Sequence, residues 1–183
     1  SPLTLTGTGF MGNGAFYSNS ATTSLVSNTV GLTVGVKVGG SGNITISNAG
    51  GVTGNVLLTK TGTGMLTVNA STTTSARTGT NQIDSGILRV QSTATTGTFA
   101  PLGTGAYALN GGTLSLGYDV NNTTTNVVNL LADSTIIADR ATAGAGSSVI
   151  TLSTLTIGSN TLKIKAGDNV TSGTAGLTLG TVT

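Results

Sequence analysis

The sequence contains no cysteine, histidine, tryptophan or glutamate, and these absences remove most of the side chains on which enzymes depend. Without cysteine there can be no disulfide framework and no thiolate metal site. Without histidine, a serine nucleophile lacks its usual base, and the commonest metal ligand is missing. The chemistry left to the chain is that of 5 Asp and 7 Lys or Arg side chains. We therefore expect no enzyme, no cofactor and no bound metal.

Charge is also scarce. Charged residues make up 7% of the chain, against about 25% in an ordinary domain, and the formal net charge is only +2. The Lys and Arg residues are scattered and have no aromatic neighbours, so we expect no nucleic-acid partner. Glu, Lys, Arg and Gln are the residues from which solvated helices are built, and their scarcity predicts almost no helix. No apolar run approaches the roughly 20 residues of a membrane helix, and we expect no membrane-embedded part.

The residues that are abundant favour strands. The chain has 29 Gly, and Thr accounts for about one residue in five, a β-branched type suited to strands. The mean hydropathy of +0.28 and the low net charge argue against disorder, which requires low hydrophobicity and high charge. Ordered β structure is the prediction.

Apolar side chains recur two residues apart in residues 58–116, the most regular stretch of the chain. This spacing places both members of each pair on one face of an extended strand. Such short strands cannot form a core alone, so their apolar faces are expected to stack on one another as successive coils of a solenoid. The pairs are Leu66 and Val68, Leu88 and Val90, and Leu114 and Leu116.

The intervals between apolar positions predict the whole fold. One position recurs every 20–26 residues or so, within the range of solenoid repeats, at Ile44, Leu66, Leu88, Leu114, Ile136 and Ile157. We predict an all-β right-handed parallel β-helix of roughly eight coils, rising about 4.8 Å per coil. Outward Thr side chains are expected to stack in ladders. Residues 1–31 are expected to close one end of the solenoid. Residues 1–9 are expected to be a short strand with Leu3 and Leu5 inward, and residues 10–31 an irregular loop or cap in which Phe10, Phe16 and Tyr17 fill the end of the core.

Residues 58–90 also carry a known pattern. Its first part has the form L-x-K-x-G-x-G-x-L-x-L and its second the form I-x-x-G-x-L-x-V. The matching residues are Leu58, Lys60, Gly62, Gly64, Leu66 and Val68, then Ile83, Gly86, Leu88 and Val90. This stretch resembles the passenger-associated strand repeat of bacterial autotransporters, and residues 102–116 are similar to what often follows it. The chain departs from the family in residues 69–79, which lack the usual aromatic turn residue.

The remaining route to catalysis joins Asp with Lys or Arg, as in β-helix enzymes that cleave polysaccharides. The candidates for such a site are Asp84, Asp119, Asp133, Asp139, Arg140, Lys163 and Lys165. The alternative is that these are single solvated charges that keep a rod soluble. Residues 39–45 have the glycines of a calcium-binding repeat, but Ile44 stands where the Asp would be.

The resemblance implies a structural function. We expect residues 1–183 to be one β-solenoid segment of a longer chain: an extracellular stalk, fibre or adhesin segment on a bacterial cell surface. Its expected partners are neighbouring repeats or further copies stacked end to end, and host or surface glycans. The alternative function is a polysaccharide-binding or polysaccharide-cleaving β-helix.

Overall fold

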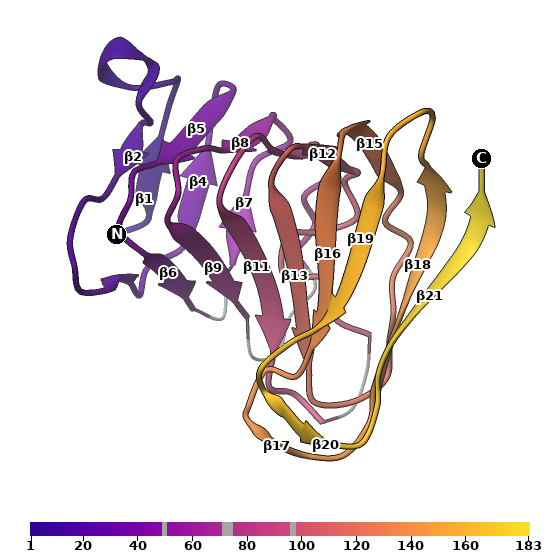
Figure 1. Ribbon diagram of the computed structural model, residues 1–183. Helices are drawn as coiled ribbons and strands as arrows, with labels where there is room; N and C mark the ends of the chain where they lie inside the picture. The colour runs from indigo at the N-terminus through magenta and orange to yellow at the C-terminus, as the bar shows by residue number, and fades with distance from the viewer. Residues whose placement is uncertain (49–50, 71–74, 96–97) are drawn as a thin grey trace.

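The computed structural model describes residues 1–48, 51–70, 75–95 and 98–183. The chain winds into a parallel β-solenoid of about seven turns, which confirms the predicted all-β fold at close to the predicted coil count. The strands follow one another along a rod from the N-terminus at one end to the C-terminus at the other (Figure 1). Within the described residues the single helical element is a 3-10 turn, η1 (Phe10–Gly12). Four residues of the aromatic-free turn, 71–74, lie outside the described residues.

Two large sheets form most of the wall of the solenoid. The first, sheet II, has nine strands: β2 (Phe16–Tyr17), β5 (Val36–Gly39), β8 (Leu58–Lys60), β10 (Asn81–Ile83), β12 (Tyr107–Asn110), β14 (Asn122–Thr123), β15 (Val128–Ala132), β18 (Ser148–Thr156) and β21 (Ala175–Val182). The second, sheet III, has seven: β3 (Ser24–Val26), β6 (Ile44–Ser47), β9 (Met65–Asn69), β11 (Ile87–Ser92), β13 (Thr113–Tyr118), β16 (Ser134–Asp139) and β19 (Leu162–Ala166).

Two smaller sheets cover part of the third side. Sheet I comprises β1 (Leu3–Leu5), β4 (Val30–Leu32) and β7 (Val52–Thr53), and sheet IV comprises β17 (Gly144–Ala145) and β20 (Val170–Ser172). Every strand pair is parallel. Each strand therefore pairs with the equivalent strand one turn along the chain, as a solenoid requires.

The core consists of stacked columns of apolar side chains. Leu66, Leu88 and Leu114 pair directly with one another on adjacent strands, and each is at most 1% exposed. Full burial of such a side chain contributes roughly 1.5–3 kcal/mol. The predicted column is correct as far as Ile136, but its next member is Ile164 rather than Ile157. The last turn is longer than the predicted interval, so Ile157 falls just beyond the end of β18.

The first turn confirms the predicted strand at residues 1–9 and corrects the predicted irregularity of residues 10–31. β1, β2 and β3 pair with β4, β5 and β6, so much of residues 1–31 belongs to a regular turn of the solenoid. Phe16 packs against the core, but Phe10 is 84% exposed and Tyr17 is 48% exposed. The predicted aromatic filling of this end is therefore wrong for Phe10 and Tyr17.

The outward columns confirm the predicted Thr ladders in part. On sheet II, Thr123, Thr151 and Thr178 pair in succession. On sheet III the Thr pairs are not extended by Thr in either direction; they are Thr113 with Thr135 and Thr45 with Thr67. The column through Thr67 instead continues to Arg89 and Ser115. Charged and hydroxyl side chains thus stand beside one another on the outside of sheet III.

Lys60 points into the solenoid. It stands in an inner column of sheet II between Val38 and Ile83, and it is 2% exposed. Its ammonium donates hydrogen bonds to three carbonyl oxygens at the adjoining corner: to Thr61 at 2.6 Å, Gly62 at 3.0 Å and, one turn later, Ser85 at 3.4 Å. Lys60 therefore ties together two successive corners. Burial lowers its pKa from 10.5 to about 8.

Gly62 shows why that corner requires glycine. Its φ is +73°, which glycine adopts at little cost. A Cβ placed on Gly62 would lie 2.4 Å from the carbonyl oxygen of Gly40, on the previous turn. The close stacking of the corners thus excludes a side chain here on two independent grounds.

A second cation, Arg77, is also enclosed. It is 1% exposed and donates to the side-chain oxygen of Asn81 and to the carbonyl oxygens of Val56 and Thr80. Burial lowers its pKa to about 10. Tyr107 pairs with Asn81 on the next strand and is itself buried, and this burial raises the pKa of its hydroxyl group.

The buried Lys60 makes stability depend on pH. Between about pH 8 and 10.5 the unfolded chain keeps the lysine proton while the folded chain loses it, so the free energy of unfolding rises with pH. Between pH 7 and 9.5 we expect a gain of about 2 kcal/mol relative to Lys60→Met, which has no such proton. Urea unfolding of both proteins at the two pH values measures it. Equal pH dependence in the two proteins would contradict the burial of Lys60.

Candidate functional site

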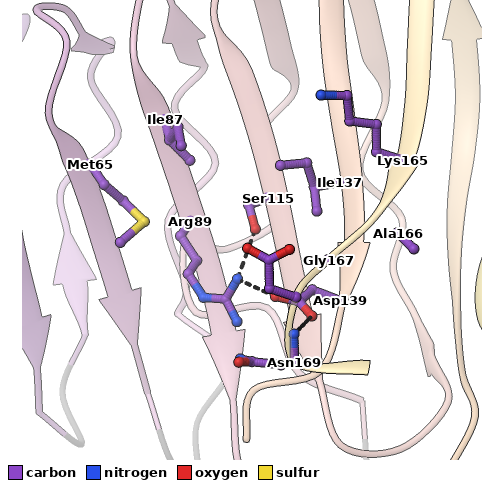
Figure 2. Close-up of a pocket in the computed structure, with 11 residues that line it drawn as sticks. Met65, Ile87, Arg89, Ser115, Ile137, Asp139, Lys165, Ala166, Gly167 and Asn169 are labelled. Atoms are coloured by element: carbon purple, nitrogen blue, oxygen red, sulfur yellow. Dashed lines mark hydrogen bonds and ion pairs between the residues drawn. The ribbon is translucent and has the colours of Figure 1, made fainter. Parts of the chain in front are cut away.

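A groove of about 480 Å³ lies on the outer face of sheet III. Its floor comes from β9, β11, β13 and β16, and its far wall from β19 and the residues that follow it (Figure 2). One part of the lining is apolar, from Met65, Ile87 and Ile137. The other part is polar or charged and comprises Arg89, Ser115, Asp139, Lys165, Asp168 and Asn169.

Arg89 occupies the centre of the polar part. It alternates with the buried Leu88 and Val90 on β11, which directs its side chain outward. One guanidinium nitrogen, Nη1, donates to Asp139 Oδ2 at 2.7 Å and to Ser115 Oγ at 2.9 Å. Figure 2 shows Arg89 reaching toward Asp139 across the strand that carries Ser115. The single guanidinium therefore links three successive turns.

The other oxygen of Asp139 extends this link to the next turn. Asp139 Oδ1 accepts a hydrogen bond from the backbone N–H of Asn169 at 3.1 Å, and the Asn169 side chain donates to the Arg140 carbonyl oxygen at 2.9 Å. A Cβ on Gly167 would lie 2.1 Å from Asp139 Cγ, so the returning chain needs glycine there. Arg89 Nη2 also donates to the Arg140 carbonyl at 2.7 Å.

This cluster leaves Asp139 poorly suited to chemistry. Its side chain is 5% exposed and that of Arg89 is 12% exposed, and both carboxylate oxygens already accept hydrogen bonds from the protein. A general base or nucleophile must instead present a free oxygen to its substrate. The arrangement acts as a clamp across four turns.

The other predicted candidates do not gather around Asp139. Asp133 and Asp139 stand just before and at the end of β16, about 20 Å apart at the usual rise per residue. Glycoside hydrolysis requires two carboxyl groups within about 5–10 Å. Lys163 lies outward on β19, and in Figure 2 the ammonium of Lys165 points away from the Arg89–Asp139 pair.

The three other candidate aspartates each accept a hydrogen bond from a group one turn further along the chain. Asp84 accepts from the Asn110 amide at 2.9 Å, and Asp133 accepts from the Thr161 backbone N–H at 2.7 Å. Asp119 accepts from Thr142 and lies 3.5 Å from Arg140. These hydrogen bonds lie at the exposed surface, which agrees with the expectation of solvated charges, and they also join adjacent turns.

The sequence-based candidates omitted Arg89, Asp168 and Asn169. The sequence did contain a signal for Arg89. It lies between the inward-facing Leu88 and Val90, so alternation along β11 places its side chain on the outer face. No comparable signal marked Asp168 or Asn169, because they follow β19 in an irregular return. Their position against Asp139 depends on the length of the last turn, which the sequence did not reveal.

Within residues 1–48, 51–70, 75–95 and 98–183, Asp side chains nowhere form a group of three or more that could hold a metal ion. In the same residues, no helix has the length and hydropathy needed to cross a bilayer.

No protein-family model, curated protein or solved structure matches this chain. The likeness to the autotransporter repeat therefore depends on residues 58–90 and 102–116 alone.

The clamp makes a prediction about stability. Asp139→Asn keeps the shape of the side chain but leaves the Arg89 guanidinium without its counter-charge. We therefore expect the free energy of unfolding to fall by about 3 kcal/mol. Guanidinium titration followed by circular dichroism measures this change. Asp168→Asn, on the exposed side of the same groove, is the matched control and should change stability by less than about 0.5 kcal/mol. Equal stability of the two variants would show that the pair does not clamp the turns.

Proposed function

We propose that this chain is a structural segment: a stiff β-solenoid stalk or fibre that forms part of an extracellular bacterial surface protein of the autotransporter-passenger type. One observation supports this most strongly. Most side-chain hydrogen bonds of the described residues join neighbouring turns, and those among Arg89, Ser115 and Asp139 in the groove on sheet III link successive turns as well. Such a distribution serves rigidity.

The corners provide most of this support. At several of them an Asn or Asp oxygen accepts the backbone N–H of a residue one turn later, at 2.7–3.4 Å. The pairs are Asn19 with Ser41, Asn43 with Met65, Asn55 with Thr78, Asn121 with Val149, and Asp133 with Thr161. These bonds add to the backbone ladders and resist bending between turns.

The motif residues also have structural positions that suit this function. Lys60 and Gly62 form a corner, and Gly86 stacks on Gly62 one turn later, where a Cβ would lie 2.3 Å from the Gly62 carbonyl oxygen. The lysine and glycines of the passenger-type repeat thus take part in stacking. This agreement supports a passenger-type protein, and with it an extracellular location.

The two ends of the rod are open to further turns. β3 and β19 are the terminal strands of sheet III, so each has one edge without a partner strand. At the C-terminal end Ile164 continues the inner column, yet it is 52% exposed. Unpaired edges and an uncovered apolar column favour addition of another turn, from the same polypeptide or from a second copy.

End-to-end association can be tested on residues 1–183 themselves. We expect electron microscopy and sedimentation at rising concentration to show rods that lengthen in steps of one molecule. Ile164→Asp places a charge on the stacking surface and should hold the protein as a monomer at concentrations where the wild type associates. Lys165→Asp introduces the same group on the outward face and should associate normally. Monomers of wild type at millimolar concentration would rule out self-stacking.

A further inference from the structure

A second hollow, of about 370 Å³, lies near the N-terminal end of the rod. It is formed where the segment around β2 meets the corners of the next two turns. Its side chains come from Asn13, Tyr17, Asn19, Ser41, Thr61 and Thr63. Among the described residues, no charged side chain lines it. We call it the N-terminal hollow.

Several polar groups of this hollow have no hydrogen-bond partner among the described residues, unlike Arg89 and Asp139 in the groove on sheet III. Asn19 Oδ1 accepts from the backbone and hydroxyl of Ser41, at 3.4 and 3.2 Å. Within the described part of the chain, the side chains of Asn13, Tyr17 and Thr63 have no hydrogen-bond partner in the protein, and all three are exposed. They are therefore free to donate to and accept from a ligand.

Exposed aromatic side chains are confined to this end of the rod. Of the six aromatic residues, Phe99, Tyr107 and Tyr118 are buried in the core and Phe16 is partly buried against it. The two that remain exposed are Tyr17, which lines the hollow, and Phe10, which lies a few residues earlier in the chain beside the exposed Met11. In a chain so poor in aromatics, this placement is not required by packing.

The loop that carries Phe10 and Met11 is held in a defined shape. It rises beyond β2 at the indigo end of Figure 1. The backbone N–H of Gly14 donates to the Thr8 carbonyl at 2.8 Å and closes the loop. Met11 has a φ of +51°, the one positive value outside glycine among the described residues. Such strain in a non-glycine residue is typical of functional sites, where the rest of the structure maintains it.

We propose that the N-terminal hollow binds a neutral saccharide. The ring of Tyr17 offers a flat apolar surface for the C–H face of a pyranose, while its hydroxyl remains available as a polar group. The amides of Asn13 and Asn19 and the hydroxyl of Thr63 suit the alternating donors and acceptors of sugar hydroxyls. An anionic or cationic ligand would find no counter-charge among the side chains that line the hollow.

The backbone beneath the hollow adds to this selectivity. The carbonyl oxygens of Thr61 and Gly62 are turned inward to the ammonium of Lys60, at 2.6 and 3.0 Å. These oxygens are thus occupied from inside and offer little to a cation from outside. The hollow would give the proposed stalk a ligand, and saccharide binding there does not require end-to-end association.

The test is a glycan array probed with the whole chain, carrying neutral hexose and N-acetylhexosamine oligosaccharides beside sialylated and sulfated ones. Hits are then measured by isothermal titration calorimetry. We expect binding to neutral glycans, at least tenfold weaker for Tyr17→Ala and little changed for Tyr17→Phe. Ile87→Ala, in the groove on the outer face of sheet III, is the matched control and should bind like the wild type. Unchanged melting temperatures establish that each variant folds.

Several outcomes would overturn the proposal. They are binding to no neutral glycan at millimolar concentration, binding to acidic glycans alone, and neutral-glycan binding that survives Tyr17→Ala. Co-sedimentation with phosphatidylcholine vesicles that is lost in Phe10→Ser would replace the saccharide by a membrane surface. None of these results would affect the association of rods, so failure of this site is distinguishable from failure of the proposed structural function.

Discussion

The structure depends on parallel, in-register pairing of each strand with its equivalent one turn later. That pairing places Leu66, Leu88 and Leu114 directly above one another and removes their side chains from water. It also repeats the corners at the same height, which is why Gly62 meets Gly40 too closely for any side chain between them. The apolar columns and the glycine corners are therefore two consequences of one constraint.

The same constraint explains how the few charges are used. Because neighbouring turns lie only about 4.8 Å apart, one long side chain can reach across several of them. Arg89 links its own turn to Ser115 and Asp139, and Lys60 links the corner at Gly62 to the next one at Ser85. These long side chains therefore use their hydrogen-bonding groups within the rod. In the N-terminal hollow, the side chains of Asn13, Tyr17 and Thr63 make no such bond among the described residues and are free to bind a ligand.

Much of the fold could be predicted from the sequence because the solenoid repeats a local rule. Alternation predicted the inner faces, and the interval between apolar positions predicted the turns as far as Ile136. The prediction went wrong at Ile157 because the last turn is longer, and its excess lies in irregular segments without periodicity. Phe10 was misplaced because hydrophobicity alone does not distinguish a core residue from one on a projecting loop.

The candidate site was less predictable. Sequence spacing marked Asp139 but not its partners Arg89 and Asn169, since these come from turns 50 and 30 residues away. Arg77 was unpredictable for a different reason: it follows a Thr-rich stretch in which no alternation indicates an inward position. Buried cations bound by carbonyl oxygens leave little trace in composition, because their partners are backbone atoms.

Because the sequence contains no cysteine, the pairing of strands on successive turns can be measured by introducing cysteines in pairs. Thr113 and Thr135 pair on the outside of β13 and β16, so cysteines at both positions should have Cα atoms about 4.8 Å apart, within the range that a disulfide spans. We predict that mild oxidation of Thr113→Cys/Thr135→Cys gives an intramolecular disulfide in the folded monomer. Met65→Cys/Thr113→Cys, two strand spacings apart, should keep its thiols. Free thiols in the first protein, or a disulfide in the second, would contradict the stacking register and with it the rod.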